Sequence, residues 1–161
     1  MARPSNQRAL TALVLIGLSA LNCAIGSING QPTHYGFIYD AYRTHRARWD
    51  LAHPPGYEYN VRYKCFCSSA LLRRTTVRVL GDSAISAIQD GDLVNQKAFK
   101  ECPTIDALYD LIYRSMESSY DRVFVRYDRR WHYPVEIFID MKASVDDDEL
   151  EVFADSFAPV E

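Results

Sequence analysis

Residues 57–67 read YEYNVRYKCFC, and this stretch decides the fold. Every second residue, from Tyr57 to Cys67, falls on one side of an extended chain. The residues between them, from Glu58 to Phe66, fall on the other side and are mostly polar. Such alternation predicts a β-strand with an aromatic face and a face rich in charged groups.

Five further strands are expected, because short runs of alternating apolar and polar residues recur between clusters of turn residues. These runs span residues 75–80, 84–89, 121–127, 134–140 and 149–157. Gly81-Asp82-Ser83 joins the first two runs, and its glycine and aspartate suit a tight reversal. Residues 128–132 form the turn of a second hairpin. The segment 90–103 is polar and is expected to be irregular.

Two helices are predicted from apolar residues spaced three and four apart. The first spans residues 37–52 and ends at Pro54-Pro55-Gly56. The second begins at Thr104, which can cap the free N–H groups, and Asp106 lies favourably at the positive end of the helix dipole. The order of elements is helix, three strands, helix, three strands. It predicts an α+β fold, in which an antiparallel sheet of about six strands, in two three-strand runs, carries two helices packed on one face.

The N-terminus is typical of an export signal. Two arginines give it a positive start, and no charged residue occurs between residues 9 and 28. We expect cleavage after Gly26, which makes residues 1–26 a signal peptide. A membrane anchor at residues 9–28 stays open as an alternative, because these 20 residues are enough to cross a bilayer as a helix. Lipid attachment at Cys23 is a third possibility.

Residues 27–36 are interpreted as a tether and residues 37–161 as a single α+β domain, large enough to bury more than half of its unfolded surface. The chain has 18 basic and 21 acidic residues, and residues 1–26 hold two basic residues and no acidic one, so the cleaved protein carries a formal charge of −5. An acidic domain lacks the basic stripe that nucleic acids require. We therefore expect an exported protein, secreted or periplasmic, with no nucleic-acid partner and with membrane contact only through an uncleaved N-terminal segment.

No pattern of catalytic or metal-binding residues is present. The sequence lacks a G-x-S-x-G elbow, an H-E-x-x-H pair and a glycine-rich phosphate loop. The spacing of the histidines is not that of zinc ligands; they are His34, His45, His53 and His132. The acidic run at residues 146–149 lacks the alternating ligands and central glycine of an EF-hand loop. We expect no catalytic residue, no metal and no cofactor.

Several separated motifs occur in a fixed order along the chain. They are Tyr59-x-Val61-x-Tyr63-x-Cys65-Phe66-Cys67, Thr104-Ile105-Asp106-x-Leu108-Tyr109-Asp110-Leu111-Ile112, Tyr127-Asp128 with Tyr133-Pro134, Ile137-x-Ile139-Asp140, and Asp147-Asp148-Glu149-Leu150. With these motifs the chain, from Trp49 to Phe157, resembles the family called domain of unknown function 6174. The resemblance implies an exported or lipid-anchored protein and a domain boundary, but no activity and no catalytic residue. Cys102 departs from the family's pattern, so no disulfide scheme is carried over.

Cys65, Cys67 and Cys102 are the candidates for disulfide or redox chemistry. Cys65 and Cys67 lie two apart on one face of the predicted strand, so we expect their Cα atoms near about 6.8 Å, the upper limit for a disulfide. A bond between them would be strained and able to exchange with the thiols of a partner. The interpretation that we favour is a structural bond from Cys102 to Cys67 or Cys65, which leaves one odd thiol.

Aromatic residues are concentrated in the turn of the second hairpin, which is expected to project at an edge of the sheet. Aromatic side chains concentrate binding energy at interfaces, so Trp131 and Tyr133 are the predicted binding residues. We predict a non-catalytic binding or inhibitor-like module whose partner is a protein of the cell envelope or the extracellular space. The alternative is a thiol–disulfide redox protein that uses Cys65 and Cys67.

Overall fold

Strand β1 (Gly56–Lys64) is the central strand of the sheet. In the computed structural model, which describes residues 35–118 and 120–160, β1 pairs antiparallel with β2 (Thr75–Leu80) on one side and with β7 (Glu149–Pro159) on the other. Tyr57 and Tyr59 are buried, whereas the residues that alternate with them are partly or fully exposed. The alternation in the sequence therefore corresponds to a buried face and a polar face.

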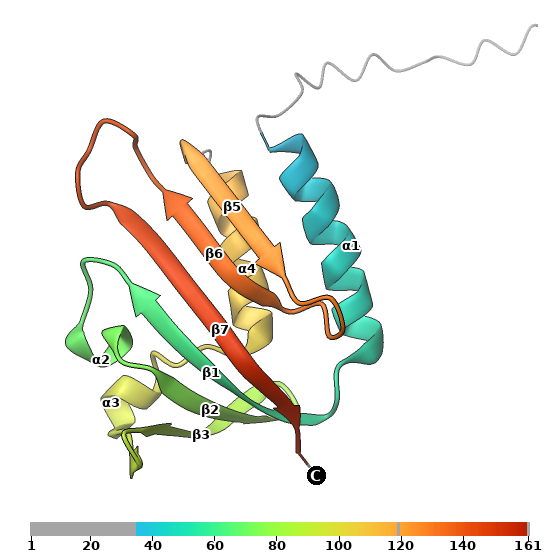
Figure 1. Cartoon of the computed structure of the whole chain (residues 1–161), viewed down its shortest axis with the longest axis vertical. Coiled ribbons are helices and arrows are strands. Elements are labelled where there is room, and N and C mark those ends of the chain that lie inside the picture. The colour runs from blue at the N-terminus through green and yellow to red at the C-terminus, as the bar shows by residue number, and fades with distance from the viewer. Residues whose placement is uncertain (1–34, 119, 161) are drawn as a thin grey trace, which may run out of the picture. The chain divides into compact units, whose positions relative to one another are not determined.

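Within the described residues the sheet has seven strands, all antiparallel, in the order β4-β3-β2-β1-β7-β6-β5 (Figure 1). The remaining strands are β3 (Ser83–Gln89), β4 (Asp92–Leu93), β5 (Arg122–Tyr127) and β6 (Pro134–Asp140). The predicted α+β class is confirmed, with one strand more than expected. The additional strand is β4, which follows Asp90 and Gly91, two residues with positive φ (53° and 92°). An Asp-Gly pair of this kind is typical of a hairpin turn, and here it returns the chain onto β3.

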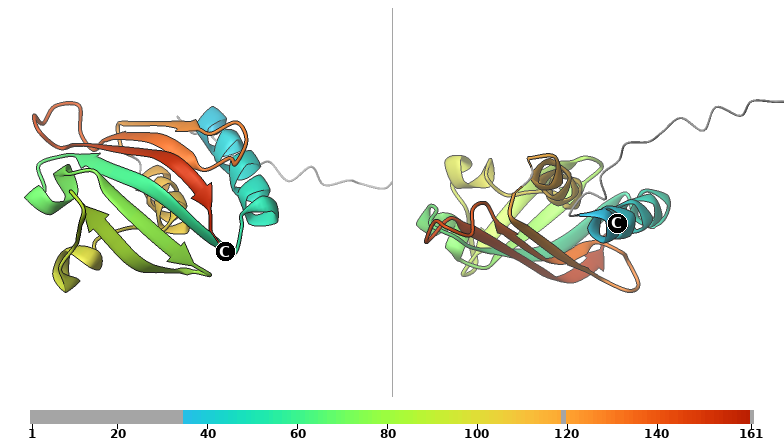
Figure 2. Two further views of the ribbon diagram at one scale, coloured as in Figure 1. Left: turned by 60° about the horizontal axis from the view of Figure 1, so that its bottom comes forward. Right: turned by 90° about the horizontal axis from the view of Figure 1, so that it is seen from above.

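Helices α1 (Gly36–Ala52) and α4 (Ile105–Glu117) both lie on one face of the sheet (Figure 2). The predicted cap of α4 is present, because the Thr104 side chain accepts a hydrogen bond from the Ala107 N–H at 3.1 Å. One stripe of α4 is buried and comprises Ile105, Leu108, Tyr109, Ile112, Ser115 and Met116. Two four-residue helices lie in the connections, namely α2 (Ser69–Leu72) and α3 (Gln96–Phe99).

Two tyrosines of β1 join the sheet to the start of α4. The Tyr57 hydroxyl accepts a hydrogen bond from the N–H of Ile105 at 3.0 Å, and the Tyr59 hydroxyl donates one to the carbonyl of Pro103 at 2.5 Å. Both side chains are fully buried, and buried hydroxyl groups need hydrogen-bond partners. These two bonds therefore hold the N-terminus of α4 over the centre of the sheet.

The predictions for the N-terminus concern residues outside the described ones. They are the signal peptide at 1–26, the alternative anchor at 9–28, the lipid site at Cys23 and most of the tether at 27–36. Of the tether, Tyr35 and Gly36 are described, and Gly36 is already the first residue of α1. Over residues 35–118 and 120–160, no helix combines the length and the apolar character needed to span a membrane.

Candidate functional site

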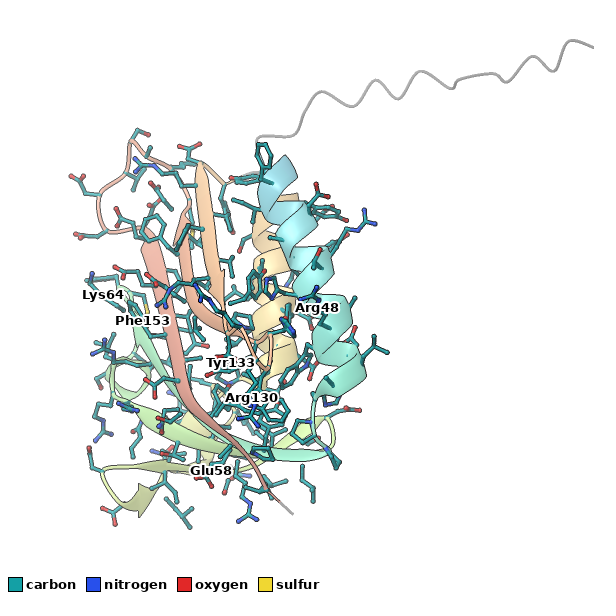
Figure 3. All side chains as sticks on the ribbon, turned by 45° about the vertical axis from the view of Figure 1, so that its right-hand side comes forward. Arg48, Glu58, Lys64, Arg130, Tyr133 and Phe153 are labelled. Carbon is teal, nitrogen blue, oxygen red and sulfur yellow. A yellow bond between two sulfur atoms is a disulfide. The ribbon has the colours of Figure 1, made fainter. Side chains whose placement is uncertain are left out.

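Over residues 35–118 and 120–160, no helix covers the face of the sheet opposite α1 and α4 (Figure 2). We call it the open face. Residues directly opposite each other on neighbouring strands share a face, and this register identifies its members. Among them are Glu58, Asn60, Arg62 and Lys64 of β1, Thr76 and Arg78 of β2, Glu151, Phe153 and Asp155 of β7, Glu136 and Phe138 of β6, and Phe124 and Arg126 of β5. Glu58, Lys64 and Phe153 are labelled in Figure 3.

Two ion pairs join charged groups of the open face to one another, and a third joins the open face to a neighbouring arginine. Ion pairs join Lys64 to Glu151 (2.5 Å), Arg126 to Glu136 (2.8 Å), and Arg74, which precedes β2, to Asp155. Pairs exposed in this way contribute little to stability, typically about 0–1 kcal/mol. They do leave the face without a dominant charge, which disfavours a polyanionic ligand such as a nucleic acid.

Three phenylalanines lie among these charged residues. Phe124, which is 53% exposed, stands directly opposite Phe138, and Phe153 lies on the next strand. The guanidinium of Arg62 covers the Phe153 ring, with its carbon 5.3 Å from the ring centre. Phe138 and Phe153 are half-buried, and aromatic rings at a surface with polar groups around them are typical of the centre of a protein–protein interface.

A hollow of about 470 Å³ opens at the end of β1 beside Phe138. It is lined by Lys64, Cys65, Phe66, Phe138, Asp147, Glu149 and Glu151. Phe66 is 93% exposed, although a large apolar side chain gains free energy when it is removed from water. The hollow and the phenylalanines therefore form one continuous candidate surface with both apolar and charged groups.

The cysteines are arranged differently from the bridge that the sequence analysis favoured. A disulfide joins Cys65 to Cys67, and Cys102 is a free thiol whose Sγ donates a hydrogen bond to the carbonyl of Ala98 at 3.4 Å. β1 ends at Lys64, so Cys65 and Cys67 lie in a bend and their Cα atoms are 5.2 Å apart, inside the usual range for a disulfide. Burial, with a smaller effect of Glu101, raises the pKa of the Cys102 thiol, which lowers its reactivity.

The bend that contains the disulfide is close to the segment before α4. The Ser68 hydroxyl donates a hydrogen bond to a carboxylate oxygen of Glu101 at 3.2 Å. Cys102 follows Glu101 directly, so the chain brings all three predicted cysteines into one region, although only two of them are bonded.

The two predicted binding residues do not project into solvent. Tyr133 is 4% exposed and packs on Phe157 with 5.1 Å between ring centres. Trp131 is half-buried, also packs on Phe157 (5.2 Å), and has the guanidinium of Arg130 over its ring at 5.1 Å. The turn therefore folds its aromatic residues against the end of β7, and Tyr133 belongs to the core.

Phe124, Phe138 and Phe153 were missed when the sequence was read alone. Each lies between inward-facing apolar residues of a predicted strand, as Phe138 does between Ile137 and Ile139. The feature of the sequence that could have identified them is an aromatic residue at a strand position where the alternation predicts a polar one. One such residue is unremarkable, and only the strand order shows that three of them lie on one surface.

Comparison with known proteins gives a family but no function. A family model described as "Family of unknown function (DUF6174)" matches residues 41–159. No curated protein and no solved structure matches the chain.

Proposed function

Because the chain belongs to the DUF6174 family, whose function is unknown, we propose from its geometry that the domain is a non-catalytic binding module of an exported protein and docks a protein partner on the open face. The observation that carries this proposal is the location of Phe124, Phe138 and Phe153 on the open face, which no helix of the described part of the chain covers.

The chemistry of the open face favours a protein over other ligands. In each of the ion pairs Lys64–Glu151 and Arg126–Glu136, the positive and negative charges cancel. The open face therefore has no excess of positive charge to attract a nucleic acid or an anionic lipid surface. A broad surface with aromatic rings inside a polar rim matches the composition of protein interfaces. The partner is expected to present an apolar patch flanked by charges of both signs.

The experiment places a photo-crosslinking amino acid at Phe153 in the full-length protein. The matched control places it at Leu51, which is 89% exposed on α1. We expect the Phe153 position to cross-link one exported protein that the Leu51 position does not. The captured protein is then purified, and its affinity is measured for the wild type, for the Phe138→Ala/Phe153→Ala variant and for Leu51→Ala.

The proposal predicts a large loss of affinity in the double variant only, because truncation of aromatic residues at the centre of an interface typically costs about 2 kcal/mol or more. Equal cross-linking from both positions, or unchanged affinity of the folded double variant, would show that the open face is not the docking surface.

A second candidate function is thiol–disulfide exchange at Cys65 and Cys67. It is favoured by one observation: the disulfide lies in a partly exposed bend beside the hollow, where a partner's thiol can approach it. In this reaction a thiolate of a partner dithiol attacks one of the two sulfurs, forms a mixed disulfide and releases the other cysteine. The partner's second thiol then resolves the mixed disulfide, so the partner is oxidised, and Cys65 and Cys67 become thiols that take up the two protons.

The test mixes the oxidised full-length protein with a reduced dithiol peptide and counts free thiols on both. Exchange predicts one peptide disulfide formed for each chain and none with Cys65→Ser/Cys67→Ser. If the peptide stays reduced, the disulfide has a structural role and the binding proposal stands alone.

A further inference from the structure

Two histidines that are far apart in the sequence meet between α1 and the turn before β6. The Nδ1 atoms of His45 and His132 are 3.2 Å apart, and the ring centres are 5.2 Å apart. Both residues are half-buried, so the pair can be reached from solvent. Figure 3 labels Arg48 on this helix and Arg130 on this turn.

We propose that His45 and His132 bind a divalent transition-metal ion of the zinc class through their Nδ1 atoms. Imidazole nitrogens bind zinc at about 2.0–2.1 Å. Two such nitrogens at a tetrahedral ion are therefore about 3.3–3.4 Å apart, which agrees with the observed separation within the usual tolerance of about 0.2 Å. Each ring then carries its proton on Nε2, and its Nδ1 lone pair points at the ion.

His132 is held in place by an unusual backbone conformation. Its φ is 66°, in the left-handed region that few residues other than glycine adopt. The Tyr109 hydroxyl donates a hydrogen bond to the His132 carbonyl at 2.6 Å, and the Asp128 side chain accepts two bonds from backbone N–H groups of the same turn. A conformation of this kind costs on the order of 1–3 kcal/mol and is concentrated at functional sites. Here it directs the ring of His132 toward His45.

His45 is oriented by stacking. Its ring lies on Tyr127 with 4.2 Å between ring centres and 6° between planes. Both imidazoles are thus fixed before any ion arrives.

The described residues supply two ligands and no more. Among them, no cluster of three or more His, Cys, Asp or Glu side chains converges in a way that could hold a metal. Water, or a donor group from a docked partner, must fill the other positions, as happens at sites that keep open coordination positions. The nearby charge of Arg48 opposes a cation, so its removal is expected to strengthen binding.

The test titrates Zn²⁺ into the full-length protein by calorimetry and follows the ring nitrogens of histidine by NMR. We expect one ion for each chain, with shifts of Nδ1 in His45 and His132 and none in His53. His45→Gln and His132→Asn should each weaken binding by more than the roughly 10-fold that loss of an outer-shell partner costs. Asparagine tolerates the left-handed backbone, so the second variant keeps the turn.

Two further variants complete the design. His53→Gln, at the C-terminal cap of α1 and outside the pair, should leave the affinity unchanged, and Arg48→Gln should increase it. The proposal is overturned if Zn²⁺ does not shift the ring-nitrogen resonances of His45 and His132. It is also overturned if both ligand variants bind Zn²⁺ with the affinity of the wild type, or if Arg48→Gln lowers that affinity. In each of these cases the two histidines form only a hydrogen-bonded pair.

Discussion

Arg62 and Phe153 face each other across β1 and β7 on the open face, with the guanidinium carbon 5.3 Å from the centre of the ring. The Phe153 ring is half-buried, and a cation over a ring near the surface contributes about 0.5–1 kcal/mol. Arg62→Ala is therefore expected to lower the free energy of unfolding by about this amount, measured by urea denaturation. Arg78→Ala on β2 is the control, because Arg78 faces Glu58 instead of a ring. An equal loss in both variants would mean that the stacking adds nothing specific.

Tyr57→Phe should destabilise the domain. The change removes the hydroxyl that accepts the N–H of Ile105, which then remains buried without this partner. An unsatisfied buried group costs about 1–3 kcal/mol. Thermal and urea unfolding measure the loss, and Tyr113→Phe is the matched control because Tyr113 of α4 is 38% exposed. A domain as stable as the wild type would show that water replaces the hydroxyl.

Alkaline pH should unfold the domain through its buried tyrosines. Burial raises the pKa of Tyr63 to about 12, and it also raises the pKa of Tyr57 and Tyr59 above the ordinary value of 10.0. The folded state therefore favours the protonated phenols. Their stabilising contribution is complete below pH 10 and is lost as the pH rises above it, through the folded-state pKa values. Unfolding followed between pH 9 and 12 by tyrosinate absorbance should be cooperative, whereas gradual titration without unfolding would contradict the prediction.

The cysteine arrangement can be checked by alkylation of the purified protein in denaturant followed by peptide mapping. Without reductant, within residues 35–118 and 120–160, we expect a label on Cys102 only, because Cys65 and Cys67 are bonded to each other. After mild reductant all three should be labelled. A peptide that links Cys102 to Cys65 or Cys67 would instead support the structural bridge expected from the sequence, since Ser68 and Glu101 already bring the two segments together.

Hydrophobic periodicity was sufficient for the six longer strands and the two longer helices, but not for the short elements α2, β4 and α3. Strands β2 and β6 have the predicted bounds, and the cap at Thr104 is present. Local signals also explain the errors. The short strand β4 was missed although Asp90-Gly91 is a turn signal, and β1 was expected to continue to Cys67, whereas it ends at Lys64. Alternation alone does not mark the end of a strand when a disulfide bends the chain there.

The candidate site was not predictable in the same way. Trp131 and Tyr133 were chosen because aromatic residues in a turn were expected to be exposed, but contacts with Phe157 bury Tyr133 and half-bury Trp131. Whether an aromatic residue in a turn is exposed depends on what the turn packs against, and that neighbour comes from the other end of the chain.

The sequence by itself determined which segments become strands and helices, and which side of each strand is apolar, because these properties depend on residues two to four positions apart. Only the tertiary structure decided that β1 pairs with β7, about 90 residues later, because pairing depends on how the complete set of apolar faces is buried at once. That pairing, together with the packing of α1 beside β5, creates every surface of functional interest: the phenylalanines of the open face and the meeting of His45 with His132.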